Sequence, residues 1–136
     1  MDILKIPAME KEEYDRFIAE EYVSRIAFKG DYPYIAPFLY VFNGKNIYFL
    51  STQYGKKVEL FRSNPQVAVE IENYSPDLSH YRFVTLQGKI DEVDQEEEKL
   101  QVREMFVDLI KKQRSLPKYI GGPGSFPRRP PGIINP

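Results

Sequence analysis

The chain has 136 residues and a formal net charge of −1 at pH 7, and 14% of its residues are aromatic, all Tyr or Phe. This length favours one domain with a single core. Because the net charge is near zero, there is no global positive field to attract nucleic acid or an anionic membrane, and we expect neither partner. The lack of cysteine excludes thiolate metal sites, and the single histidine, His80, argues against a histidine-rich metal centre.

The first residues, MDILKIPAMEKEEYDRF, contain acids and no long apolar run. They predict neither a signal peptide nor a membrane span, so we expect a cytoplasmic protein. Residues 9–20 follow with Tyr14, Phe17 and Ile18 at helical spacing, which predicts an amphipathic helix lying on a core.

Three strands are predicted next. Residues 22–28 form the first, GDYP at 30–33 is a turn, and the almost wholly apolar residues 34–42 form the second. The dipeptide NG at 43–44 predicts a two-residue hairpin turn with positive φ at both positions, and residues 45–52 return as the partner strand. Pro37 cannot donate to a ladder, so it marks an edge, a bulge or a break in pairing.

The second half of the chain begins with a short helix that Lys56 and Lys57 open. In residues 66–72 apolar and polar side chains alternate, which predicts a half-buried strand with Val67, Val69 and Ile71 on one face. A long strand follows at 81–93, with Val84, Leu86 and Ile90 on one face, and its Gly88 predicts a bulge or a close backbone approach.

Asp94 and Glu97 resemble a capping box that opens a helix running to about Ser115, with Leu100, Val107 and Ile110 among its apolar positions. We expect one domain over residues 1–115 and a Pro/Gly-rich tail over 116–136 without regular structure. Strands joined by tight turns and apolar on both faces predict a mainly β fold with flanking helices, an antiparallel barrel that is closed or nearly closed. Helices, or a second copy of the chain, would cover its outside.

The stretch YGKKVELFRSNP, residues 54–65, is the strongest candidate for a binding site. A strand ending in the hydroxyls of Ser51 and Thr52 leads through Gly55 to Lys56 and Lys57 at a helix start. Helix N-termini present amides and a partial positive charge, so the pair would suit a phosphate. In the alternative interpretation both lysines are solvated and the hydroxyls only cap the helix.

The run YVSRIAFKGDYPYIAPFLYVFNGKNIYFLSTQYGKKVELFRSNPQVAVEIE, followed by YRFVTLQGKIDEV, resembles the flavin-binding split β-barrel family of pyridoxamine 5′-phosphate oxidase relatives. Within that family it is most similar to the nitroimidazole-reductase-like branch. The resemblance covers about residues 10–110, and its most specific parts are the strand-YGKK-helix-NPQV block and the spacing to LQGKI. It implies a six-stranded split barrel forming a homodimer, with FMN in each of two clefts between the subunits.

The resemblance also implies which residues hold FMN. The phosphate would be bound by Lys57 with Lys56 before it, and Ser51 and Thr52 would lie near the phosphate or the ribityl chain, beside Gly55. The isoalloxazine ring would lie along the backbone of Pro37, Phe38 and Leu39 in the second strand. The partner subunit would supply the segment that contains Arg82 and Phe83. In the alternative interpretation Phe38 and Leu39 are core residues only, and Arg82 forms an ion pair on the surface.

Departures from the family pattern bear on the substrate. Ala36 and Val41 stand where the oxidases carry an arginine and a lysine, so we expect a substrate other than pyridoxamine 5′-phosphate. Leu50 stands where many nitroimidazole-reductase-like proteins carry a histidine. The tail replaces the final family strand, so either the barrel closes with fewer strands or the tail crosses the dimer and lines the cleft.

Three functions remain open from the sequence. The first is an FMN-dependent oxidoreductase acting on a small molecule, with no catalytic residue identified and with Tyr40, Tyr54 and Tyr81 as candidate proton donors. The second is a non-catalytic binding or carrier protein for flavin, a deazaflavin or heme, of which heme fits worst because His80 is the only imidazole. The third is a structural dimer whose aromatic surface binds protein.

Overall fold

The computed structural model describes residues 11–51 and 56–116. The elements follow the order that the sequence predicts, and they are α1 (Lys11–Glu20), β1 (Val23–Phe28), β2 (Tyr34–Phe42), β3 (Ile47–Phe49), α2 (Lys56–Ser63), β4 (Gln66–Tyr74), β5 (Tyr81–Lys89) and α3 (Glu96–Ser115). α3 ends at the residue expected from the sequence, and the predicted tail lies, apart from Leu116, outside the described residues.

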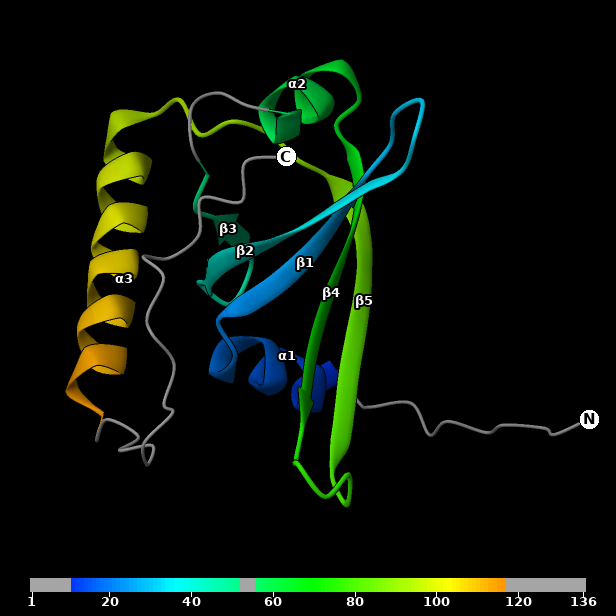
Figure 1. Cartoon of the computed structure of the whole chain (residues 1–136). Helices are drawn as coiled ribbons and strands as arrows, with labels where there is room; N and C mark the ends of the chain where they lie inside the picture. Colours follow the sequence, from blue (N-terminus) through cyan, green and yellow to red (C-terminus); the bar gives the residue numbers. More distant parts are fainter. Residues whose placement is uncertain (1–10, 52–55, 117–136) are drawn as a thin grey trace, which may run out of the picture.

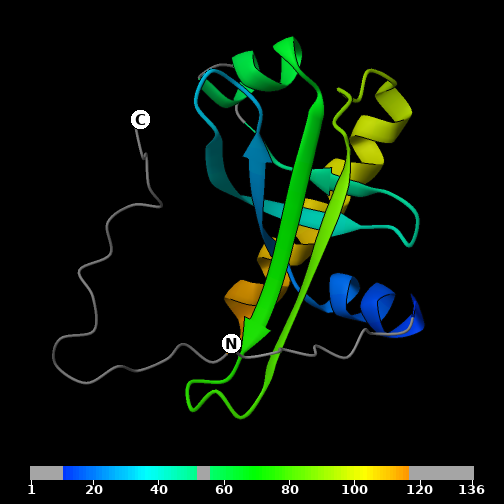
Figure 2. The same ribbon diagram turned by 90° about the vertical axis from the view of Figure 1, so that its right-hand side faces the viewer.

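The strands form one antiparallel sheet in the order β3-β2-β1-β4-β5. Figures 1 and 2 show the sheet curled into a half-barrel, with α3 standing beside β2 and β3 and α1 at one end. The expected number of strands is therefore wrong for the part of the chain that is described, which has five strands and not six. β3 and β5 remain as edges, and the sequence after Ser115 carries prolines that cannot donate to a ladder.

The core fills the concave side of this half-barrel. Ile26 and Phe28 of β1 point inward together with the apolar face of β4, which confirms the alternation predicted for residues 66–72. Phe38 of β2 lies between two other rings, with its centroid 5.9 Å from that of Phe28 and 6.3 Å from that of Phe49. Tilted and edge-on pairs of this kind are favourable beyond the area they bury.

β2 has the predicted bounds, and its proline sits where the sheet has a free side. β3 pairs only with Tyr40–Phe42, so at Pro37 the strand has a hydrogen-bonded neighbour on one side, where Pro37 lies opposite Arg25 of β1. A residue without an N–H is tolerated at such a position. The prediction that Pro37 marks an edge is confirmed.

The hairpin between β2 and β3 forms, but its turn lies one residue later than predicted. Asn43 N–H donates to the Asn46 carbonyl, so the central residues are Gly44 and Lys45, and only Gly44 has a positive φ, of 92°. The Asn43 side chain instead accepts hydrogen bonds from the amides of Lys45 and Asn46, at 2.9 and 2.6 Å. This local side-chain turn replaces the positive φ expected of Asn43.

Three predictions on the last strand and helix are wrong. β5 pairs with β4 without interruption, Gly88 lies opposite Val67, and a Cβ on Gly88 would meet nothing within 4 Å, so there is neither a bulge nor a close approach. The capping box at Asp94 and Glu97 is also absent. The N-cap of α3 is Gln95, which makes no side-chain capping hydrogen bond. β5 ends at Lys89, so residues 90–95 form a linker rather than strand.

Tyr40 ties the sheet to α1. Its side chain is 1% exposed, and its hydroxyl donates a 2.7 Å hydrogen bond to the carbonyl of Ile18 in the last turn of the helix. Carbonyls in a last helical turn have no partner within the helix, so this contact satisfies one of them inside the core.

We expect Tyr40→Phe to lower the free energy of unfolding by about 1–3 kcal/mol, because it leaves the buried Ile18 carbonyl without a donor. Urea unfolding followed by circular dichroism measures this. The control Tyr74→Phe changes an exposed ring that makes no hydrogen bond within the described residues, and should shift stability by less than about 0.5 kcal/mol. Equal midpoints for Tyr40→Phe and the wild type would show that the contact does not stabilise the fold.

Candidate functional site

Lys56 and Lys57 follow a strand and open a helix, as predicted, but the strand β3 (Ile47–Phe49) is shorter than the predicted 45–52 and ends before Ser51. β3 ends at Phe49, Ser51 is exposed, and α2 begins at Lys56 with Lys57 as its second residue. Thr52 and Gly55 lie outside the described residues, as do the side chains of Lys56 and Lys57. The backbone amides of the first turn of α2 are therefore presented beside two lysine positions, an arrangement that suits an anion.

The position of α2 is fixed by its other end. Leu60 and Phe61 pack against the core, and the chain leaves the helix when Asn64 N–H donates to the Leu60 carbonyl at 2.9 Å. The Asn64 side chain then accepts a hydrogen bond from Gln66 N–H at 3.2 Å, which starts β4. Asn64 and Pro65 thus make the turn between α2 and β4. The N-terminus of α2 is thus held on a rigid base.

The segment 37–39 divides its side chains between two environments. Pro37 is exposed on the outer face of the sheet, and Leu39, opposite Val23, is half-buried on the same face. Phe38 points inward and is 6% exposed, so its side chain belongs to the core and only its backbone remains for a ligand. Its carbonyl already accepts a 3.1 Å hydrogen bond from the buried Ser24 hydroxyl.

Arg82 is not brought to the same face as Pro37 within one chain. Its guanidinium lies 5.1 Å from the centroid of the Phe17 ring, and its Nε lies 3.1 Å from Nε2 of the His80 ring. Phe17 is a core residue of α1, so Arg82 covers the inner side of the half-barrel, where it makes a cation–π contact. Its neighbour Phe83 lies on the other face of β5 and is 38% exposed.

The structure describes two of the three tyrosines that the sequence offers as candidate proton donors. Burial raises the pKa of Tyr40, whose hydroxyl is committed to the Ile18 carbonyl. Tyr81 is exposed and stacks on Tyr74 of the facing strand, with ring centroids 6.1 Å apart. Tyr54 lies outside the described residues. Tyr40 is therefore a structural residue rather than a donor to substrate.

A charged cluster beside Pro37 was missed by sequence reasoning. Arg25, opposite Pro37, forms an ion pair with Glu72 and lies 3.6 Å from Oε1 of Glu70, too far for a hydrogen bond. That Oε1 atom is buried and has no hydrogen-bond partner among the described residues. The alternation of residues 66–72 assigned both acids to the polar face, but only the register of β1 between β2 and β4 places them at Arg25.

The outer face of the sheet around this cluster is uncovered. Figure 1 shows no helix over the outer side of β4 and β5. Large apolar side chains are exposed along these strands and their neighbours: Val23, Ile35, Tyr74, Tyr81 and Phe83. Several large apolar side chains exposed on one face are typical of an interaction site.

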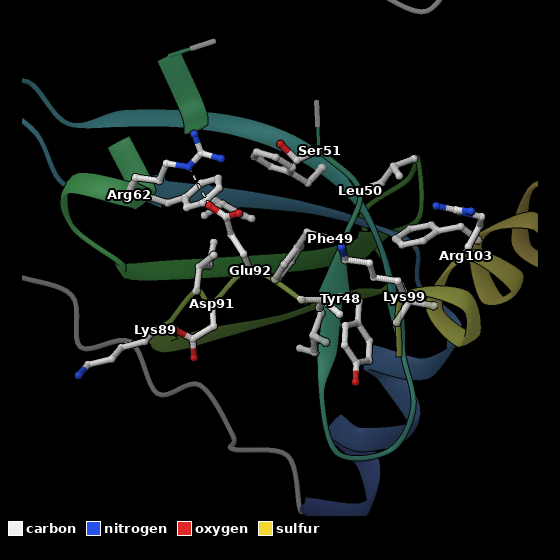
Figure 3. Close-up of a pocket in the computed structure, with 18 of the residues that line it drawn as sticks. Tyr48, Phe49, Leu50, Ser51, Arg62, Lys89, Asp91, Glu92, Lys99 and Arg103 are labelled. Atoms are coloured by element: carbon white, nitrogen blue, oxygen red, sulfur yellow. Dashed lines mark hydrogen bonds and ion pairs between the residues drawn. The ribbon is translucent and has the colours of Figure 1, made fainter. Parts of the chain in front are cut away.

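A cavity of about 590 Å³ lies on the opposite, concave side, between α3 and the barrel. Figure 3 shows its rim, where Lys99 reaches from α3 toward Phe49 and Arg62 pairs with Glu92. Ser51 also lines this cavity, whereas Pro37, Leu39 and Arg82 do not. The predicted site residues are therefore spread over two faces of one chain.

Metal binding and membrane insertion find no support in the described ranges. No group of three or more His, Asp or Glu side chains there is arranged to hold a metal ion. None of the described helices combines the length and the apolar character needed to cross a membrane.

The charge cluster gives a testable pH dependence. Burial, and then the negative charge of Glu72, raise the pKa of Glu70 above its ordinary 4.5, against the opposing effect of Arg25. The folded state therefore binds this proton more tightly than the unfolded chain, and stability falls as pH rises from about 4.5 through the raised value. We expect Glu70→Gln to unfold at a higher urea concentration than the wild type at pH 7, with the difference disappearing below about pH 4.

The control for that measurement is Glu72→Gln, which removes the carboxylate closest to Arg25 and should not stabilise the protein. A Glu70→Gln variant that is less stable than the wild type at pH 7 would show that Arg25 outweighs the burial of Glu70.

Comparisons with known proteins agree with the fold and the order of motifs. The family model described as pyridoxamine 5′-phosphate oxidase matches residues 10–121. An uncharacterized protein of Rhizobium meliloti (strain 1021) is 29% identical over 89 residues, which are 65% of this chain and 58% of that protein. The chain therefore spans little more than half of this curated relative.

Two solved structures have the same fold. A FAD-binding protein from Mesorhizobium loti shares 26% identity over 78% of each chain, with a TM-score of 0.65. The FAD-binding protein from Mycobacterium smegmatis is 17% identical, covers 73% of this chain and 84% of its own, and has a TM-score of 0.63, a likeness of fold alone. Since the family model spans most of the 136 residues, the chain belongs to the pyridoxamine 5′-phosphate oxidase family of split-barrel proteins.

Proposed function

We propose that the protein is a flavoprotein that binds FMN at the junction of β3 and α2 and acts as an oxidoreductase on a small molecule. The observation that carries the proposal is that α2 begins at the lysine pair, in the segment that follows β3 and the exposed residues Leu50 and Ser51. Membership of a flavin-binding fold family supports the same conclusion. FMN suits this junction because its one terminal phosphate matches one helix N-terminus.

The chemistry of the junction fits a phosphate. A lysine in the first turn of a helix is unfavourable by about 0.3–1 kcal/mol, and a bound dianion reverses the sign of that interaction. Lys57, with Lys56 before it, would supply the charge, the first amides of α2 the hydrogen bonds, and Ser51 and Thr52 hydroxyls beside them. The flavin supplies redox chemistry, and the chain's part is to seat the phosphate and to position the ring.

The ring would lie over the outer face of β2, where Pro37 and Leu39 are presented beside the ion pair of Arg25 and Glu72. One chain leaves this face open, so we propose that a second copy covers it and completes the site. The exposed apolar side chains of β1, β2, β4 and β5 support such a homodimer. Phe83 faces outward and is better placed than Arg82 to reach across to a partner.

The substrate is proposed to differ from pyridoxamine 5′-phosphate. Ala36 is buried in the core and Val41 is 8% exposed, so neither position offers the cationic side chain that the oxidases use. A flavin carrier without turnover is the alternative, which the structural role of Tyr40 favours because it removes one proton donor. An oxidoreductase and a carrier can be distinguished by reducing the bound flavin with NADH or NADPH. Only in an oxidoreductase should its reoxidation depend on an added substrate.

Lys57→Ala tests the phosphate seat. Loss of a charge-assisted hydrogen bond of about 1.5–3 kcal/mol predicts an FMN dissociation constant raised by about 10- to 150-fold, measured by quenching of flavin fluorescence. Riboflavin, which lacks the phosphate, should bind the variant and the wild type equally well.

The matched control is Lys45→Ala, at an exposed lysine in the turn between β2 and β3. It removes the same charge away from the junction and should leave FMN affinity within about twofold. Wild-type protein that binds no FMN, or a Lys57→Ala variant with unchanged affinity, would contradict the proposal.

A further inference from the structure

The cavity beneath α3 is apolar and open to solvent. Its volume of about 590 Å³ lies between the inner face of α3 and the two edges of the half-barrel, which approach it through β3 and the end of β5. Five phenylalanines contribute to its wall: Phe28, Phe38, Phe49, Phe61 and Phe106. Water in contact with such an apolar lining is unfavourable, so an apolar group that displaced this water would stabilise the protein.

α3 is long for the contacts it makes. Of its 20 residues only Phe106 is buried, while Val107 on the cavity wall is 42% exposed and Leu100 is 56% exposed. A helix with this many apolar side chains in water has an incompletely covered apolar face. The sequence continues past α3 for 21 residues, 116–136.

An acidic segment connects the cavity wall to the start of α3. Residues 91–98, DEVDQEEE, contain six acids in eight residues and no base. Asp91 and Glu92 line the cavity, and the segment leads into the first turn of α3. Asp91, Asp94 and Glu97 make no ion pair with another residue that the structure describes.

Residues 117–136 have the complementary composition. They contain Lys118, Arg128 and Arg129 and no Asp or Glu, together with the large apolar residues Tyr119, Ile120, Phe126, Ile133 and Ile134. Their prolines disfavour a regular strand but favour an extended chain that loses little entropy on docking.

We propose that residues 117–129 run back along α3, fill the cavity with their apolar side chains and place Arg128 and Arg129 against the acidic segment 91–98. The lengths agree. α3, with 20 residues at 1.5 Å each, is about 30 Å long. Residues 117–128 in a polyproline-like conformation span about 37 Å, at about 3.1 Å each, which is one helix length plus the turn at Leu116.

The tether favours the chain's own tail over other occupants. Residues joined directly to α3 are present at the cavity at an effective concentration of the order of millimolar, which exceeds that of a second copy in dilute solution. The cavity wall itself carries Arg62, Lys89, Lys99 and Arg103 beside Asp91 and Glu92, so a cationic occupant is favoured only at the end of the cavity where Asp91, Asp94 and Glu97 lie without an ion pair in the described part of the chain. This proposal does not depend on flavin binding, and among the described residues the two proposed sites share only Ser51, which lines the cavity and lies at the junction of β3 and α2.

A disulfide trap tests the docking, since the chain contains no cysteine. Val102 lies on the cavity wall, and Phe126 is expected near it when the tail is docked. The Val102→Cys, Phe126→Cys double variant of the full chain should form an intramolecular disulfide under mild oxidation, at a rate independent of protein concentration.

The matched control is Gln101→Cys with Phe126→Cys. Gln101 is exposed, is absent from the cavity wall and precedes Val102 by one position, which turns it about 100° round the helix. We expect its cross-linking to be at least about tenfold slower. Equal rates for the two pairs, or disulfides that form only between chains and increase with protein concentration, would overturn the proposal.

The charge contact is tested in the same double-cysteine background. Arg128→Glu with Arg129→Glu should slow cross-linking several-fold, and adding Asp94→Arg with Glu97→Arg should restore it, because the opposite charges then face each other again. A rate that charge reversal leaves unchanged would overturn the placement of the arginines at residues 91–98.

Discussion

The register of β1 between β2 and β4 is the constraint on which the two faces of the molecule depend. It places Ile26 and Phe28 inward, and it sets Arg25 opposite Pro37 on one side and Glu70 on the other. A slip of one residue would bury Arg25 and expose Ile26, so the core and the outer face are specified together. The same register turns Phe38 and Tyr40 toward the core, where Phe38 packs against other rings and Tyr40 contacts α1.

The two faces then take different roles. The outer face carries Pro37, Leu39 and the Arg25 cluster next to exposed apolar side chains, and in our proposal it takes the flavin ring and a second copy. The concave face holds the core and, beneath α3, a cavity that we assign to the chain's own tail. The junction of β3 and α2 connects them, since Ser51 lines the cavity while α2 packs beside β1.

Much of this could be predicted from residue patterns because they are local. The alternation of Val67, Val69 and Ile71, the apolar run of β2 and the start of α2 at Lys56 all appear at the predicted places. The turn at Gly44 and the N-cap of α3 could not be predicted in this way. Hydrogen bonds to the Asn43 side chain moved the turn by one residue, and the N-cap of α3 is Gln95, one residue after the predicted Asp94. The Arg25 cluster and the inward position of Arg82 depend on which strands are neighbours, which a single sequence does not specify.

Native mass spectrometry of the purified protein in the presence of FMN tests the central claim most directly, because one spectrum gives both the number of chains and the mass of any bound ligand. We expect the mass of two chains with two FMN molecules, and under denaturing conditions the mass of the chain alone, because FMN is not bound covalently. A single chain without flavin at every FMN concentration would contradict it.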